Sequence, residues 1–426
     1  MIKTNGFSLM KIGFTLLCSL VLLRVSAQNN NSPYSLMGIG DLEDGFMNRT
    51  TGLGSTGISY RNNRSLITNN PAALSALDNQ WFCGELGVKG KFVTYSGTPV
   101  SPTAKTSSDI TFKHFVLGTK IFKHWGSAAG LTPYSSENFQ YNGEKLLGYQ
   151  GAQIPYYNEG YGGLNRVFWA NGYEFFHHLS LGITSSYIFG SINNKSILQG
   201  PTGSAIYLSK NEQTFYSNFY FDYGLQYYGA LSKHWDFSIG LVYANQGWMN
   251  TDHYITVLNI DSMTLRTKED IGTYTIPTSY GAGLSITHNK KYTFLADYRF
   301  QNWGINHSNS SGFVYENSQR ASVGFEISHK KIFYNTVFET NYFQFGAYYN
   351  KSYVVVNGTP IEDMGLTAGM GLSSMRTRTF ELGLNVVLQY GIRGTTENNL
   401  IKENYGTISF IFSFRDFWYT KGRRFD

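Results

Sequence analysis

The chain is poor in cysteine, proline, charge and long hydrophobic runs. Its 426 residues include 2 cysteines and 9 prolines, and only 15% of them are charged. No cysteine or histidine has the spacing of metal ligands. A mean hydropathy of -0.25 excludes a bundle of transmembrane helices, which would need several long apolar segments. The net charge of +6 is mild, and no basic run is interleaved with aromatic residues, so we expect no nucleic-acid partner.

One apolar run lies near the N-terminus and has the layout of a secretory signal. Lys3 and Lys11 form a basic region, residues 12–23 are apolar, and the small residues at 25–27 fit a cleavage site. The alternative is a transmembrane anchor, but the run is short for one. The pattern therefore predicts that residues 1–27 are a signal peptide and that the protein is exported.

Removal of this peptide makes Gln28 the first residue. Cys18 lies in the apolar run and is lost with it, so Cys83 remains as a single cysteine. One cysteine cannot form an internal disulfide. We therefore expect no internal disulfide in the exported chain.

Aromatic residues and glycine are abundant, and they occur in alternating patterns. The chain has 32 tyrosines, 31 phenylalanines and 46 glycines. Residues 292–300, 380–390 and 408–414 place apolar side chains at every second position. Because a strand turns successive side chains to opposite faces, each such stretch has one apolar and one polar or small face. In a membrane barrel the apolar face contacts lipid, and we assign Phe410, Phe412 and Phe414 to it.

About fourteen such stretches follow one another between residues 81 and 419. Short connections, such as Lys123-His124 and His177-His178, alternate with longer ones, such as 137–161, 193–213 and 249–278. Short periplasmic turns alternating with longer outer loops are typical of outer-membrane barrels. The sequence therefore predicts an all-β fold: a transmembrane antiparallel β-barrel of about 14 strands in the outer membrane, with both chain ends in the periplasm.

A compact, turn-rich segment precedes the barrel. Residues 51–78 begin with Gly52, Gly54 and Gly57 and contain Asn70-Pro71-Ala72. Pro71 suits the first position of a short helix, and Asn69 or Asn70 could cap it. We expect residues 28–80 to form a periplasmic tail and a hatch inside the barrel lumen, with residues 32–41 loosely structured.

These hatch residues resemble those of the long-chain fatty acid outer-membrane transporter (FadL-like) family. The likeness rests on Gly52-Leu53-Gly54, on Gly57 and on Asn70-Pro71-Ala72, followed at once by the first barrel strand at Trp81. The resemblance implies a fourteen-stranded barrel plugged by its N-terminal hatch. It also implies passive transport of a hydrophobic small molecule, such as a fatty acid.

The C-terminus departs from the usual ending of such barrels. A basic extension, residues 420–426, follows the last predicted strand. Related barrels also act as accessory subunits of secretion machinery. The alternative function is therefore a non-transporting barrel, a plug or shuttle subunit of a type IX-like secretion translocon, with a secretion-machinery protein as its partner.

Several charged residues should point into the lumen, because they lie on the polar face of their strands. They are Arg166, Glu174, Asp236, Asp297, Arg299, Arg320, Glu326 and Glu381. One interpretation is a structural network that fills the barrel and fixes the hatch. The other is a ligand site, in which an arginine pairs with an anionic head group while Ile58, Leu66 and Leu74 line an acyl chain.

No constellation of catalytic residues emerges from the sequence. GxSxG and HExxH are absent, and no Lys-Ser/Thr follows the glycines at 52–57, so they are not a phosphate loop. We expect a protein that is not an enzyme and needs no cofactor and no metal. Its expected partners are outer-membrane lipid and a hydrophobic ligand or a secretion-machinery protein. An apolar lumen cavity would favour transport, and a filled lumen would favour the accessory subunit.

Overall fold

The computed structural model describes residues 32–43, 46–97, 105–147, 152–199, 207–259, 264–269, 273–306, 312–333, 336–375 and 380–417. The predicted signal peptide and the C-terminal extension lie outside these ranges, and both stay predictions. No helix within the described ranges is long and apolar enough to cross a membrane.

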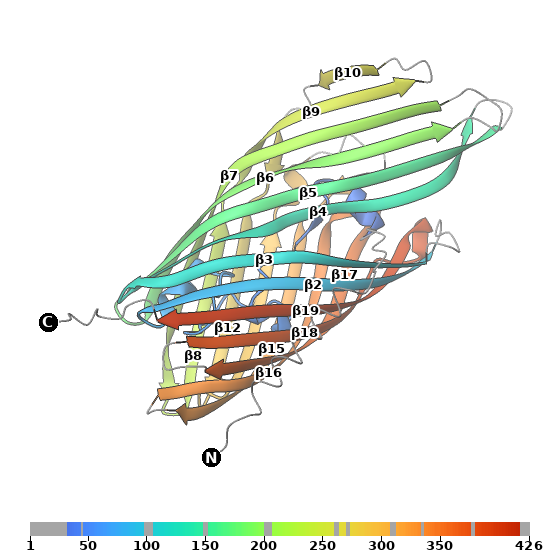
Figure 1. The fold of residues 1–426 in the computed structure, drawn as a ribbon. Helices are drawn as coiled ribbons and strands as arrows, with labels where there is room; N and C mark the ends of the chain where they lie inside the picture. Colours follow the sequence, from blue (N-terminus) through green and yellow to red (C-terminus); the bar gives the residue numbers. More distant parts are fainter. Residues whose placement is uncertain are drawn as a thin grey trace.

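Fourteen antiparallel strands form one closed barrel (Figure 1), as the sequence predicted. The last strand pairs with the first from Ile401–Gly97 to Phe417–Trp81, which closes the wall. In chain order the barrel strands are β2 (Trp81–Gly97), β3 (Thr106–Phe122), β4 (Trp125–Leu147), β5 (Ala152–Phe175), β6 (Leu179–Gln199), β7 (Tyr207–Ser232), β8 (Trp235–Ala244), β12 (Ser279–His288), β13 (Tyr292–Gln301), β15 (Ser318–Phe333), β16 (Thr336–Val356), β17 (Thr359–Met375), β18 (Phe380–Arg393) and β19 (Ile401–Phe417).

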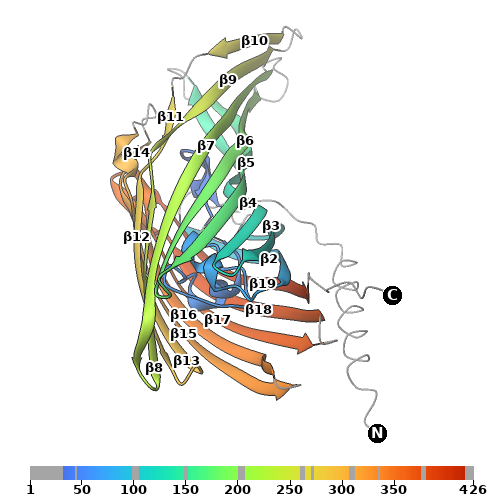
Figure 2. The same ribbon diagram turned by 90° about the vertical axis from the view of Figure 1, so that its left-hand side faces the viewer.

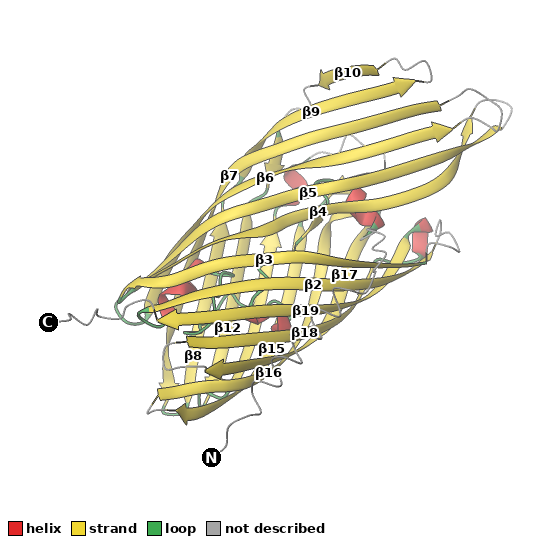
Figure 3. Cartoon of the chain, in the orientation of Figure 1, coloured by secondary structure: helices red, strands yellow, loops and turns green. Residues whose placement is uncertain are grey.

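Shorter elements complete the described chain (Figure 3). The remaining strands are β1 (Asp41–Leu42), β9 (Gly247–Asn259), β10 (Thr264–Glu269), β11 (Tyr274–Ile276) and β14 (Phe313–Tyr315). The 3-10 helices are η1 (Pro33–Leu36), η2 (Arg49–Leu53), η3 (Pro71–Ala76), η4 (Trp303–Ile305) and η5 (Glu397–Asn399).

Alternation in the sequence becomes the two faces of the wall. In β12, Tyr280 and Leu284 are exposed, whereas Gly281 and Ser285 between and after them are buried. A strand of a membrane barrel presents its apolar side chains to lipid and its small or polar ones to the lumen. Because glycine and serine are small, the inner face leaves space in the lumen for other parts of the chain.

The strands β4 to β7 are much longer than the sequence indicated. They have 21 to 26 residues, whereas β8, β12 and β13 have 10 each. They project beyond the rest of the barrel (Figure 1). The expected loops at 137–161 and 193–213 are therefore mostly strand, and the one at 249–278 contains β9, β10 and β11. Their polar, glycine-containing sequences look like loops, but long neighbouring strands supply the pairing that local propensity does not.

Residues 46–78, which we call the lumenal segment, lie inside the barrel (Figure 2). Leu53, Leu66 and Leu74 have no exposed surface. Each lies against a wall glycine: a Cβ added at Gly118 would be 2.5 Å from Leu66, and one at Gly324 would be 2.8 Å from Leu53. Only a residue without a Cβ allows such a close approach.

Candidate functional site in the barrel lumen

The deepest contact between the lumenal segment and the wall is a cluster around Arg49. Its Nη2 lies 2.7 Å from Glu326 Oε1 and its Nη1 lies 2.5 Å from Glu339 Oε2. Its guanidinium lies 3.7 Å from the ring centroid of Tyr342, and the Tyr60 hydroxyl donates to Glu326 at 2.8 Å. Burial alone would lower the pKa of Arg49. The negative charges of Glu326 and Glu339 outweigh this effect and raise the pKa well above its usual value. Removing one partner of such a buried pair is strongly destabilising, so the cluster fixes the segment to β15 and β16.

A second charged cluster holds the far end of the lumenal segment. Arg64 Nη1 lies 3.3 Å from Glu381 Oε1. Arg415 Nη1 lies 3.1 Å from Glu381 Oε2, and Arg415 Nη2 lies 2.8 Å from Asp78 Oδ2. Because Glu381 and Arg415 are on β18 and β19, this cluster fixes the segment where the barrel closes.

Asn70 connects the segment to the opposite side of the wall. Its Oδ1 accepts a hydrogen bond from the backbone N–H of Ala72 and caps η3, as the sequence indicated. Its Nδ2 donates to the carbonyl oxygens of Ile58 at 2.8 Å and Leu225 at 3.1 Å. One side chain thus satisfies the helix start, the segment itself and β7.

The wall beside η3 is made of glycines. A Cβ at Gly224 would lie 2.0 Å from Asn70 Oδ1, and one at Gly182 would lie 2.4 Å from the Pro71 carbonyl carbon. A Cβ at Gly172 would lie 2.3 Å from the Pro71 carbonyl oxygen. The close fit of η3 against β5, β6 and β7 therefore depends on these glycines.

The glycines at the start of the segment each have a structural reason. Gly54 has φ +66°, a left-handed conformation that glycine adopts without strain. A Cβ at Gly52 would lie 2.3 Å from Gln344 Oε1. A Cβ at Gly57 would lie 2.7 Å from Thr50 Cγ2.

The barrel wall is interrupted between β3 and β4. Their pairing runs from Phe122–Trp125 to Phe115–Leu131 and ends there. We call the stretch beyond Phe115 and Leu131 the seam. Beside it, Lys113 is an extra residue in the β2–β3 pairing and Tyr134 is one in the β4–β5 pairing. Such bulges bend a strand, and Pro133 cannot donate to the ladder, so the two strands diverge.

Residues 32–43, which we call the N-terminal strap, fill this seam. The strand β1 within it pairs with β4 at Ser135 and Ser136. Asp41 receives two hydrogen bonds from Arg393, at 2.7 and 2.6 Å, and Glu43 receives one from Lys113 at 2.5 Å. The expectation that residues 32–41 are loosely structured was wrong, because these contacts give the strap a fixed place.

An apolar cluster of buried side chains lies in the lumen at the end opposite the short turns. The strap contributes the fully buried Ile39 and the nearly buried Tyr34, and η4 contributes Trp303. Tyr353 stacks near Trp303, with ring centroids 4.4 Å apart, and donates to the carbonyl oxygen of Gly40 at 2.7 Å. We call this cluster the apolar cap.

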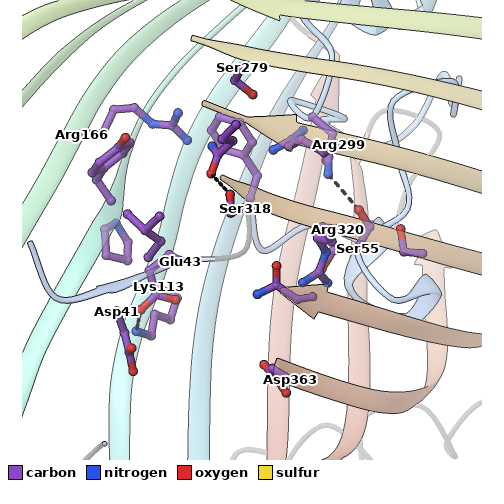
Figure 4. Close-up of a pocket in the computed structure, with 18 of the residues that line it drawn as sticks. Asp41, Glu43, Ser55, Lys113, Arg166, Ser279, Arg299, Ser318, Arg320 and Asp363 are labelled. Carbon is purple, nitrogen blue, oxygen red and sulfur yellow. Dashed lines mark hydrogen bonds and ion pairs between the residues drawn. The ribbon is translucent and has the colours of Figure 1, made fainter. Parts of the chain in front are cut away.

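A cavity of about 290 Å³ lies between the apolar cap and the lumenal segment (Figure 4). Four of the predicted lumen residues line it: Arg166, Asp297, Arg299 and Arg320. Its charged lining also comprises Asp41, Glu43, Lys89, Lys91, Asp109, Lys113, Asp222, Asp363 and Arg393. The cavity is therefore polar, and an aliphatic ligand would meet charge on most sides.

The other predicted lumen residues lie elsewhere. Asp236 and Glu326 line a second cavity, of about 460 Å³, on the short-turn side of the segment. Glu174 accepts a hydrogen bond from Tyr228 at 2.8 Å, and Glu381 belongs to the Arg415 cluster. The roles of all these residues stay predictions.

Sequence reasoning missed the arginines of the lumenal segment. The sequence patterns gave no role to Arg49, Arg61 or Arg64, although they assigned Glu326 and Glu381 to the lumen. Glutamates facing into a barrel need cationic partners. The arginines of the segment were the nearest cations, and that signal could have found them.

Nothing in the described ranges suggests a metal centre. They contain no group of three or more His, Cys, Asp or Glu side chains that could hold a metal ion. The charged groups are instead paired with each other or face the cavity.

Comparisons with known proteins agree on the fold. The BamG family model matches residues 8–426. The chain superposes on a FadL homologue from Pseudomonas aeruginosa with a TM-score of 0.62 and 11% identity, covering 89% of this chain and 100% of the other. The toluene transporter TodX of Pseudomonas putida superposes with a TM-score of 0.58 and 17% identity, covering 89% of this chain and 100% of the other. The monoaromatic hydrocarbon channel CymD superposes with a TM-score of 0.53 and 14% identity, covering 87% of this chain and 97% of the other. No curated protein matches the sequence.

Proposed function

The chain belongs to the BamG family, and from the segment fixed in its lumen by buried ion pairs we propose that it is a non-conducting barrel subunit of a protein assembly in the outer membrane. The contact that carries this proposal is Arg49 between Glu326 and Glu339. A hatch that moves during transport would have to separate these buried charges, which costs about 3–5 kcal/mol when one partner is removed. These buried ion pairs are what we expect of a segment that blocks the lumen permanently.

Two further features support a sealed barrel. The apolar cap occupies the lumen at the end opposite the short turns, with Ile39 and Trp303 fully buried. The cavity below it is small and lined by charge. Hydrophobic ligands bind in largely apolar pockets, and this one is poorly suited to them.

The family assignment is consistent with a part in outer-membrane machinery. A type IX-like translocon is one such assembly, and a barrel that is sealed by its own N-terminal region could serve there without leaking. The surface available for partners includes the long strands β4 to β7, which extend beyond the rest of the barrel.

The test is to purify the tagged full-length protein from its native membranes in mild detergent. We expect it to migrate as part of a larger complex with stoichiometric partners. Liposomes that contain the purified barrel should take up labelled palmitate and labelled toluene no faster than empty liposomes. A barrel that purifies alone and gives saturable uptake would contradict the proposal.

Passive transport of hydrophobic molecules, such as long-chain fatty acids, is the second candidate. Its support is the fold, which the chain shares with outer-membrane channels for toluene and monoaromatic hydrocarbons. The seam adds a place where the lumen approaches the membrane laterally. Under this candidate, Arg166, Arg299 or Arg320 would meet an anionic head group, and the uptake assay would be positive for the fatty acid.

A further inference from the structure

The short turns of the barrel carry a surplus of lysine. Residues 122–125, 175–178, 231–235, 288–292 and 329–332, which form or adjoin these turns, are called the short-turn rim. The rim holds no aspartate or glutamate and six lysines: Lys123, Lys233, Lys290, Lys291, Lys330 and Lys331. None of these lysines makes an ion pair within the described ranges.

Few acids near the rim are available to balance this charge. The partly exposed acids nearest to it are Asp78, Glu174, Asp236 and Asp416. Asp78 already accepts a hydrogen bond from Arg415, and Glu174 accepts one from Tyr228. The rim therefore favours a partner that carries negative charge.

The second cavity, of about 460 Å³, reaches this rim, because His177, Lys290 and Lys330 line it. Its charged side chains are Arg49, Arg61, Lys290, Lys330, Asp236, Glu326 and Glu339. Arg49 and the two glutamates are bonded to one another and nearly buried. Arg61 stacks on the ring of Tyr228, 3.6 Å from the centroid. A partner at the mouth of the cavity would therefore meet Lys290, Lys330 and the half-buried Asp236.

The turn between β5 and β6 adds an exposed aromatic residue in a disfavoured conformation. Phe176 and His177 have φ +49° and +64°, a left-handed region in which a Cβ is unfavourable. The turn between β12 and β13 has the same length and the same left-handed pair, but it begins with Asn289, which tolerates this conformation. Phe176 is 86% exposed, so packing within the described chain compensates little for its backbone. Strain of this kind is typical of residues with a function, and an exposed aromatic residue suits a contact with another molecule.

We propose that the short-turn rim docks an acidic segment of a periplasmic protein, with carboxylates on Lys290 and Lys330 and an apolar side chain against Phe176. The inference rests on the proposed function, since such a protein would be another member of the assembly. Phe176 adjoins His177, which lines the same cavity as the two lysines, so one segment can contact all three. A lipid surface fits less well, because lipid surrounds the barrel from outside, whereas both lysines line a cavity within it.

The binding test uses the purified full-length barrel and a fluorescent peptide of glutamates interrupted by phenylalanines. A second peptide has glutamine at every glutamate. We expect saturable binding of the acidic peptide that weakens as salt is added, and no binding of the glutamine peptide. Lys290→Gln combined with Lys330→Gln should weaken binding about tenfold, because two exposed ion pairs together contribute about that factor. Lys105→Gln combined with Lys210→Gln removes the same charge from exposed positions at the opposite end of the barrel and should change nothing.

Phe176→Asn separates docking from folding. Asparagine tolerates the left-handed conformation, so heat-modifiable gel mobility should show a barrel that melts no lower than the wild type. Binding of the acidic peptide should nevertheless weaken about tenfold, because the aromatic contact is lost. Leu265→Asn, which changes an exposed apolar residue on β10 at the opposite end, is the matched control and should bind like the wild type.

Equal binding of the acidic peptide by the wild type and the rim variants would overturn the inference. So would retention on phosphatidylglycerol vesicles that the rim variants lose, without any peptide binding, because the rim would then be a membrane contact. A barrel that purifies with stoichiometric partners but does not bind the acidic peptide would overturn this inference alone. A barrel that purifies alone and binds the peptide through these residues would support the docking surface and overturn only the proposed function.

Discussion

The N-terminal region is anchored at two levels of the barrel, and the two anchors differ in burial. Near the short turns, Arg49 and its partner Glu326 each retain 3% exposure. At the seam, the strap is held by Arg393–Asp41, with 15% and 19% exposure, and by Lys113–Glu43, with 12% and 19%. The lower anchor is the more deeply buried of the two, and the upper one is partly exposed to water.

This difference indicates which part of the chain can move. A deeply buried pair is costly to break because a lone charge would remain in a low-dielectric site. A partly hydrated pair is worth much less, because water replaces the lost partner. The lumenal segment is therefore a fixed part of the barrel, while the strap is the part of the N-terminal region that can be displaced most easily.

The largest expected effect comes from Arg49→Met, which leaves Glu326 and Glu339 together without their cation. Docking of the lumenal segment should weaken by about 3–5 kcal/mol. Hydrogen exchange of backbone amides in residues 50–60 measures this directly. The triple variant that also carries Glu326→Gln and Glu339→Gln removes all three charges and should recover much of the protection. If Arg49→Met exchanged like the wild type, the lower anchor would not be the stronger one.

The next prediction concerns the wall against which both anchors rest. Phe412 lies on the outer face of β19, so Phe412→Arg should destabilise the barrel by about 2–4 kcal/mol if it lies near mid-membrane. Ser413→Arg, on the other face, should cost less. Heat-modifiable gel mobility of the folded barrel measures both. Equal melting of the two variants would mean that the assigned lipid face is incorrect, and the anchors would then have to be located anew.

Local patterns were enough to predict the wall but not the anchors. Alternation within ten residues identifies which side chains of β12 or β19 face the lumen, because that is decided by the strand itself. The cap of η3 by Asn70 is also local. The pairing of Arg49 with Glu326 joins residues 277 positions apart, and it requires the strand order and the register of the whole barrel.

The seam and the long strands were missed for related reasons. A bulge at Lys113 or Tyr134 is one extra residue, and alternation that slips by one position looks like an irregular strand end. The lengths of β5 and β6 depend on each other, since their pairing continues from Phe175–Leu179 to Tyr156–Leu198. A sequence pattern describes one strand at a time, so it does not show how pairing with a neighbouring strand extends both strands.

Between the two anchors, Asn70 provides a test of intermediate size. Asn70→Leu removes the cap of η3 and the hydrogen bonds from Asn70 Nδ2 to the carbonyl oxygens of Ile58 and Leu225, at a cost of about 1–3 kcal/mol. Ile58 keeps one donor, Gln226 Nε2, at 2.9 Å. Exchange should accelerate in residues 71–76, while heat-modifiable mobility shows that the barrel still assembles. Asn142→Leu, at an exposed position on β4, is the control. If Asn70→Leu prevented barrel assembly, the lumenal segment would be required for folding of the wall.

The smallest effect should come from the strap. Asp41→Asn removes one charge from the Arg393–Asp41 pair but keeps the size of the side chain and part of its hydrogen bonding. Because the pair is partly hydrated, we expect a loss of about 1 kcal/mol or less. Exchange should increase in residues 33–42 and remain unchanged in residues 50–60, since the lower anchor does not depend on this pair. Lys268→Gln disrupts a pair with Asp252 that is more than half exposed, and it sets the baseline for a surface contact. If Asp41→Asn also loosened residues 50–60, the two anchors would be coupled, and displacement of the strap would also loosen the lumenal segment.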